Sequence, residues 1–148
     1  MIPGNLKLPL LALPLLVVLA GCNPQSRGFS LPKGDVAQGE ADFVRLQCIA
    51  CHSVGDVEWA GATTGETIHV KLGGQTTALK TYADLLTSIV NPSHKLSRGN
   101  DPGTVTDDGR SRMRVYNNVM TVQELIDIVT FLQESYEVWT PEPYPYGM

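Results

Sequence analysis

Five consecutive residues, Cys48-Ile49-Ala50-Cys51-His52, constrain this chain more than any other feature of its sequence. Two cysteines separated by two residues and followed at once by a histidine form the spacing at which a c-type haem is attached. The chemistry explains the spacing, because two thiols must reach the two vinyl groups on one edge of the porphyrin while the next side chain turns its imidazole under the iron. The motif therefore predicts one covalently attached haem c, with Cys48 and Cys51 as attachment points and His52 as an iron ligand.

Other uses of the paired cysteines fit the chain less well. A thioredoxin-like redox pair belongs in a βαβ context, which the sequence does not predict. A structural zinc site takes four ligands, but the chain has three cysteines and no second cysteine pair. A simple disulfide within the motif would leave the adjacent histidine unexplained.

Residues 1–21 are predicted to be a lipoprotein signal peptide. The apolar run from Leu8 to Ala20 has 13 residues, fewer than the about 20 that a membrane-spanning helix needs. It ends in Leu19-Ala20-Gly21-Cys22, which resembles the lipobox of bacterial lipoproteins, where cleavage precedes an acylated cysteine. We therefore expect Cys22 to anchor the mature protein in the lipid bilayer, on the periplasmic side of a bacterial membrane. The alternative is a plain signal peptide with a chance cysteine.

The composition fits one small folded domain behind this leader. Of 148 residues, 43% are hydrophobic and 18% charged, which is typical of globular domains. The net charge of −4 argues against a nucleic-acid partner. We expect a lipidated tether over 22–34, the folded domain over 35–137 and an extended, proline-spaced tail over 138–148.

Three helices are predicted in the domain from capping residues and apolar periodicity. Their expected bounds are about Val36 to Ala50, Tyr82 to about Val90, and Val122 to about Ser135. The buried stripe expected on the last helix consists of Val122, Leu125, Ile126, Val129 and Leu132. Between the first two helices, Thr67 to Lys80 contains two β-like runs around Gly73-Gly74, which predict a small β-hairpin.

Together these features resemble the class I monohaem cytochromes c. The resemblance covers about residues 35–136 and rests on the intact haem motif, on Gly39 and Phe43 in the preceding helix, and on Phe131-Leu132 in a capped last helix that follows a methionine. It implies a mainly α class I cytochrome c fold, with three or more helices around one haem. It also implies that the first and last helices pack against each other at the glycine and the aromatic residue.

The resemblance further implies the second iron ligand. Family members often read M-x-x-[FY]-x-x-x-L-T-x-x-E-L, with the first methionine on the iron, and the segment from Met113 to Leu125 reads MRVYNNVMTVQEL. This register places Met113 on the iron and Met120 at the leucine that packs under the last helix. The alternatives are an open site or another ligand, namely Met120, Met148, His69 or His94.

In one respect the chain departs from the family. Many members carry Gly-Pro-x-Leu downstream of the haem motif, where a backbone carbonyl accepts the Nδ1 proton of the axial histidine. No proline lies between Cys51 and Pro92 in this chain. The acceptor for His52 is therefore not assigned by the sequence, although one is expected.

A haem held by both His52 and Met113 has no open coordination position, so the resemblance implies a single-electron carrier and not an enzyme. Arg110, Arg112 and Arg114 alternate with Ser111 and Met113, and in an extended run they would point away from the iron and rim the haem crevice. We expect redox protein partners to dock near these arginines. The alternative is that they pair with the haem propionates or with two nearby acids, Asp107 and Asp108.

Two other functions stay open at this point. The chain could be the haem c subunit of a multi-subunit oxidoreductase, such as a dehydrogenase or a sulfur-oxidising complex. Less expected is a gas-binding haem sensor or small peroxidase, which would need an open or displaceable sixth position.

Overall fold

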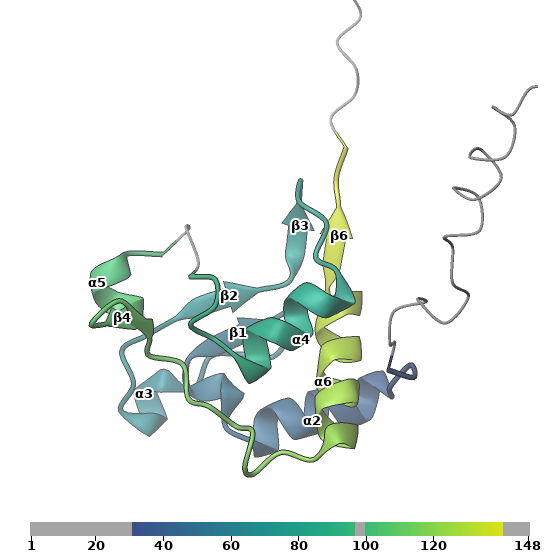
Figure 1. Ribbon diagram of the computed structural model, residues 1–148, viewed down its shortest axis with the longest axis horizontal. Helices are drawn as coiled ribbons and strands as arrows, with labels where there is room; N and C mark the ends of the chain where they lie inside the picture. The colour runs from purple at the N-terminus through teal and green to yellow at the C-terminus, as the bar shows by residue number, and fades with distance from the viewer. Residues whose placement is uncertain (1–30, 97–99, 141–148) are drawn as a thin grey trace, which may run out of the picture. The chain divides into compact units, whose positions relative to one another are not determined.

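The computed structural model describes residues 31–96 and 100–140, and predictions for the lipobox, Cys22, most of the tether and Met148 lie outside these ranges. The folded unit begins at Pro32. Within the two described ranges, no helix is long and apolar enough to cross a membrane. The elements, in chain order, are α2 (Val36–Arg45), η2 (Cys48–Ala50), β1 (His52–Val54), α3 (Gly61–Thr64), β2 (Val70–Leu72), β3 (Gly74–Thr76), α4 (Tyr82–Val90), α5 (Pro102–Val105), β4 (Thr106–Asp107), β5 (Arg110–Ser111), α6 (Val122–Glu134) and β6 (Tyr136–Val138) (Figure 1).

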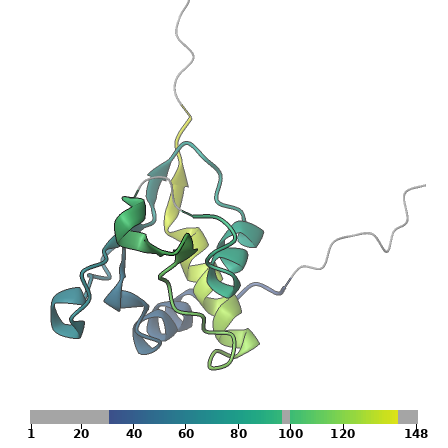
Figure 2. The same ribbon diagram turned by 60° about the vertical axis from the view of Figure 1, so that its left-hand side comes forward.

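Helices α2 and α6 cross, as both views of the ribbon show (Figures 1 and 2), and Gly39 of α2 lies at their closest approach. A Cβ atom on Gly39 would lie 2.1 Å from the backbone oxygen of Asp127 and 2.8 Å from Cβ of Phe131. One turn further along, the ring of Phe43 packs edge-on against Phe131, with ring centroids 5.8 Å apart. The first and last helices therefore meet at the glycine and the aromatic residue, as expected, because a glycine lets the two backbones approach this closely.

The starts of α4 and α6 are confirmed as predicted. Each begins with a capping box, in which Thr81 and Asp84, or Thr121 and Glu124, satisfy each other's backbone N–H groups. The predicted stripe on α6 is buried at Ile126, Val129 and Leu132, and Leu125 packs against the same core. Val122 was predicted wrongly: it is 64% exposed, because it is the first helical residue and precedes the first core contact of α6.

Helix α2 ends five residues earlier than the predicted Ala50, at Arg45. Gln47 adopts the left-handed conformation with φ of 63°, and its N–H donates to the carbonyl of Val44. This closes the helix in the manner usual for a C-terminal glycine, and Cys48–Ala50 then form a 3₁₀ turn. The haem motif therefore leaves the axis of α2 and does not continue it.

The predicted hairpin over Thr67–Lys80 is wrong. Strand β2 pairs in parallel with β1, and β3 pairs in parallel with β6, so the two β-like runs belong to different ladders. Gly73 and Gly74 both have φ of 77°, and the N–H of Gly74 donates to the carbonyl of Ser135 at 2.8 Å. The two glycines thus turn the chain away from β1 toward the end of α6.

A small hairpin does form elsewhere, between β4 and β5, which pair antiparallel. Its two central residues, Asp108 and Gly109, have φ of 46° and 74°, as a tight two-residue hairpin turn requires. The run Asp107-Asp108-Gly109 is typical of a turn, but no strands were predicted beside it.

The N-terminal end of the folded unit is attached to α6, and its C-terminal end is attached to β3. Lys33 and Gly34, the last residues of the expected tether, contact α6: Lys33 pairs with Glu134 at 3.0 Å, and the N–H of Gly34 donates to Thr130 Oγ1 at 3.0 Å. At the other end, the N–H of Trp139 donates to the carbonyl of Thr76 at 2.9 Å. The expected extended tail therefore begins within a β-ladder.

The α2–α6 crossing makes a direct prediction. Gly39→Ala should lower the free energy of unfolding by about 3 kcal/mol, because the added methyl group overlaps backbone atoms of α6 that cannot move without separating the helices. Urea denaturation followed by circular dichroism measures this. Gly103→Ala is the matched control, since its Cβ would meet no heavy atom closer than 3.6 Å. Equal stability of the two variants would show that the crossing tolerates a side chain.

Candidate functional site

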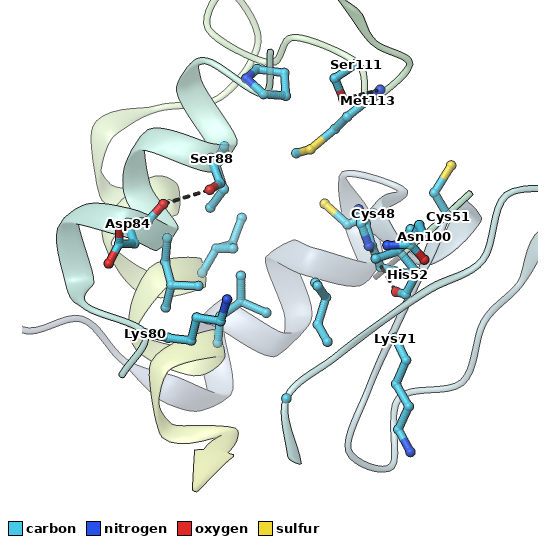
Figure 3. A pocket seen from close by; sticks show the side chains of 18 of the residues that line it. Cys48, Cys51, His52, Lys71, Lys80, Asp84, Ser88, Asn100, Ser111 and Met113 are labelled. Carbon is cyan, nitrogen blue, oxygen red and sulfur yellow. Dashed lines mark hydrogen bonds between the residues drawn. The ribbon is translucent and has the colours of Figure 1, made fainter. Parts of the chain in front are cut away.

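A cavity of about 1270 Å³ lies among β1, β2, α4, α6 and the segment that follows β5 (Figure 3). It exceeds the roughly 300–1,000 Å³ of pockets for drug-sized ligands. Its walls include apolar side chains from several elements, among them Phe43 of α2, Leu85 of α4, and Ile128 and Leu132 of α6. All four predicted site residues within the described ranges line it, namely Cys48, Cys51, His52 and Met113.

His52 is held at the start of β1 by its pairing with Val70. The N–H of Val70 donates to the carbonyl of Cys51 at 2.8 Å, and Nδ1 of His52 lies 3.1 Å from the carbonyl oxygen of Val70. A carbonyl can only accept, so Nδ1 carries the proton and Nε2 keeps its lone pair. Val70 is therefore the acceptor that the sequence left unassigned, and a parallel ladder supplies it.

The electrostatic surroundings keep His52 neutral. Burial lowers the pKa of its imidazole, and neighbouring His69 lowers it further, whereas the hydrogen bond to Val70 opposes the shift. A neutral imidazole with an oriented Nε2 is the form that coordinates a metal ion.

The two thiols of the motif are also uncharged. Burial raises the pKa of Cys48 to about 11. Burial likewise raises the pKa of Cys51, and the charge of Glu66 adds to this, while Arg112 and Arg114 act in the opposite direction. Figure 3 shows the sulfur of Cys48 directed toward the open centre of the cavity.

Met113 approaches the cavity from the segment after β5. Its N–H donates to Ser111 Oγ at 3.2 Å, and the N–H of Ser111 donates to Ser93 Oγ at 3.1 Å. Its thioether points into the cavity (Figure 3). Met120 lines the cavity too, but it also packs against the hydrophobic core, as the staple position of α6 predicts.

The other candidate ligands lie differently. His94 is exposed and is not among the cavity-lining residues. His69 lines the edge of the cavity but is exposed, and its Nε2 is hydrogen-bonded to Ser53 Oγ at 2.9 Å.

Two residues of the site were missed in the sequence. Tyr116 is 8% exposed and lines the cavity; burial raises the pKa of its hydroxyl, and the nearby Cys48 thiol raises it further. Trp59 donates from Nε1 to the carbonyl of Ala50, inside the motif, at 2.8 Å. The M-x-x-[FY] spacing from Met113 was a signal for Tyr116, whereas no local pattern indicates Trp59.

The alternation expected around Met113 is confirmed. Arg110, Arg112 and Arg114 are exposed, whereas Ser111 and Met113 between them are partly buried. Arg112 donates to the carbonyl of Thr104 at 3.0 Å. No ion pair joins these arginines to another side chain of the described ranges.

Among the residues described, two thiols, an imidazole and a thioether thus surround one largely apolar cavity. These are the groups that could attach a haem and occupy both axial positions of its iron. Searches of protein-family models, of curated proteins and of solved structures give no match to this chain.

The burial of the thiols predicts unequal reactivity. In a Cys22→Ser chain without bound haem, iodoacetamide at pH 8 should label Cys51 before Cys48, because a pKa of about 11 leaves Cys48 almost entirely as thiol. Labelling of Cys48 should still accelerate up to pH 11. Peptide mass spectrometry across pH measures both rates, and a plateau near pH 9 for Cys48 would contradict the buried environment.

Proposed function

We propose that this chain is a membrane-tethered, monohaem c-type cytochrome that transfers single electrons between redox partners outside the cytoplasm. The observation that carries the proposal is the convergence of Cys48, Cys51, His52 and Met113 on one cavity, although Met113 is distant from the motif in sequence. The cavity walls are largely apolar, as a haem requires, and the acceptor at Val70 orients the histidine.

When bound, haem c supplies an iron that accepts and returns one electron. The residues of the chain set the conditions for that exchange. Nε2 of His52 and the thioether of Met113 would fill both axial positions, leaving none for a substrate, and a thioether favours the reduced state. The apolar part of the wall and the buried ring of Tyr116 would reduce the contact of a bound haem with water, which also favours the less charged, reduced form. The chain is accordingly proposed as a carrier without a catalytic residue of its own.

The proposed location rests on the sequence of the leader. Acylation of Cys22 would supply at least two chains, which anchor a protein stably where a single chain does not. The fold begins at Pro32, so a short segment would separate the lipid from the domain.

Visible spectra of the purified protein test this function. The wild type should show a low-spin haem c that does not bind carbon monoxide when reduced. Met113→Ala should bind carbon monoxide and have a lower midpoint potential, because it opens one axial position and removes the thioether. Met120→Ala is the matched control and should keep the low-spin spectrum.

Each contrary result has a distinct meaning. A wild type without covalent haem would refute the proposal. Carbon monoxide binding by the wild type would favour the gas-sensor alternative, and an open site in Met120→Ala alone would transfer the ligand role from Met113 to Met120. Stable co-purification with a catalytic subunit would favour the oxidoreductase-subunit alternative.

The charge distribution favours an acidic redox partner. Lys71, Lys80, Lys95 and Arg112 line the cavity, together with one acidic residue, Asp84. Arg110 and Arg114 are exposed beside Arg112, and the acids Asp107 and Asp108 at the nearby hairpin turn offset them only in part.

The two other lysine and arginine residues of the described ranges are engaged elsewhere. Lys33 pairs with Glu134, and Arg45 pairs with Asp42 and Glu124. Within residues 31–96 and 100–140, the lysines and arginines without an ion pair therefore line the cavity or lie beside Arg112, although the whole chain has a net charge of −4. Such a local field steers an oppositely charged partner toward the cavity.

This asymmetry can be tested by the sign of a salt effect. Oxidation of the reduced protein by ferricyanide, an anion, should slow about twofold to tenfold as ionic strength rises, because salt screens attraction to the cations. The negative net charge of the whole chain would instead repel ferricyanide, so that the rate would rise with ionic strength. Arg112→Gln with Arg114→Gln should flatten the dependence, whereas the control Lys33→Gln should not. A rate that rises with salt in the wild type would place electron exchange on another face.

A further inference from the structure

The carbonyl groups of the haem motif are held by residues that lie beyond it in the chain. The carbonyl of Ile49 accepts from the N–H of Ala60 at 2.8 Å, that of Ala50 accepts from Trp59 Nε1 at 2.8 Å, and that of Cys51 accepts from Val70 at 2.8 Å. Trp59 and its neighbour thus provide two of these three bonds. The bond to Ala50 comes from the side chain of Trp59, so it depends on a tryptophan at this position.

The indole of Trp59 is itself fixed from two sides. A Cβ atom at Gly61 would lie 1.9 Å from the indole ring, so position 61 leaves the space that the ring occupies. The ring also stacks on His69, with centroids 4.9 Å apart and planes 15° apart. A ring held in this way presents Nε1 to Ala50 with little freedom.

The stack connects the indole to both strands that hold the axial histidine. Nε2 of His69 is hydrogen-bonded to Ser53 Oγ at 2.9 Å, and Ser53 directly follows His52 on β1. His69 also directly precedes Val70, whose carbonyl accepts from His52. Trp59 therefore contacts the attachment turn directly and the β1–β2 pair through His69.

The turn needs such support because it begins from an unfavourable backbone conformation. Gln47, immediately before Cys48, has φ of 63°, a left-handed conformation that is unfavourable for a residue other than glycine. Conformations of this kind persist where surrounding contacts hold them.

We propose that Trp59 is a positioning residue of the haem site, which fixes the Cys48–Cys51 turn through Ala50 and the orientation of His52 through His69. The inference rests on the proposed function, since the orientation of His52 matters for the bound iron. Its consequence is specific. If Trp59 no longer holds the turn, the Nδ1–H bond of His52 to Val70 loosens, the imidazole donates less to the iron, and the reduced state becomes more favoured.

The test compares Trp59→Phe with Trp139→Phe in the full, haem-loaded chain. Phenylalanine keeps a ring against His69 but removes the donor to Ala50, whereas Trp139 is 53% exposed and its backbone N–H donates to Thr76 of β3, outside the motif. These are the two tryptophans of the chain. In Trp59→Phe the midpoint potential should rise, so that the ratio of reduced to oxidised protein at a fixed solution potential increases roughly threefold or more. The paramagnetically shifted haem methyl resonances of the oxidised protein, which report imidazole orientation, should move as well.

A second readout does not depend on the iron. Hydrogen exchange at the amides of Ala60 and Val70 should accelerate about threefold to tenfold in Trp59→Phe, the range expected for one lost hydrogen bond. Trp139→Phe should leave exchange, potential and methyl resonances at their wild-type values. If Trp59→Phe does not fold, His69→Phe keeps the stack, removes the bond to Ser53, and should shift the potential and the methyl resonances in the same direction.

The outcomes separate the two proposals. Faster exchange with an unchanged potential and unchanged methyl resonances would show that Trp59 only stabilises the fold, and would overturn the inference. Wild-type exchange in Trp59→Phe would overturn it as well. A wild-type protein without haem would instead refute the proposed function, and the exchange rates would still show whether Trp59 holds the turn.

Discussion

The close approach of α2 and α6 at Gly39 is the constraint on which the rest of the structure depends. It brings Phe43 and Phe131 into contact, and Phe43 lines the cavity together with Ile128 and Leu132 of α6. Because α2 ends shortly before the haem motif, the same crossing fixes where the motif emerges. Helix α6 is followed by β6, which pairs with β3. This pairing also fixes the start of the segment that leads from β3 to α4. A change at one glycine would therefore displace elements on both sides of the proposed haem.

The structure orients the imidazole of His52, the proposed iron ligand, without the proline-containing loop found in many class I cytochromes c. A parallel β1–β2 ladder of three residue pairs puts Val70 opposite His52. The segment that closes this ladder, residues 55–69, contains Trp59 and His69, which hold the turn from outside. A longer connection with its own internal contacts thus supplies the carbonyl acceptor in this chain, whereas the proline-containing loop supplies it in many class I cytochromes c. The sequence shows the missing proline but not what replaces it, since a backbone carbonyl leaves no side-chain signature.

What could be predicted from the sequence was determined by local interactions. The capping boxes at Thr81 and Thr121 depend on residues three apart, and both were placed correctly. The end of α2 was missed because its left-handed residue is Gln47 and not a glycine. The partners of β2 and β3 could not be read from a run of alternating residues, since β1 and β6 are distant in sequence. Met113 was predicted to be a ligand through the spacing of a family motif. Trp59 was not predicted to have a role, because its partner is a backbone carbonyl that only tertiary structure brings near.

The two sides of the proposed haem differ in how they are held, and this difference bears on function. His52 is fixed by a β-ladder and by a stacked pair of rings, so its position is set by backbone pairing. Met113 lies in a segment without regular structure. Its N–H donates to the hydroxyl of Ser111, and the N–H of Ser111 donates to the hydroxyl of Ser93. An electron carrier changes least on reduction where its ligands are held most firmly, so the histidine side should keep its geometry and any redox-linked adjustment should fall on the methionine side. That is also the side on which Arg112 and Arg114 are exposed. A partner that docks at these arginines would therefore contact the segment most able to respond to the oxidation state of the iron.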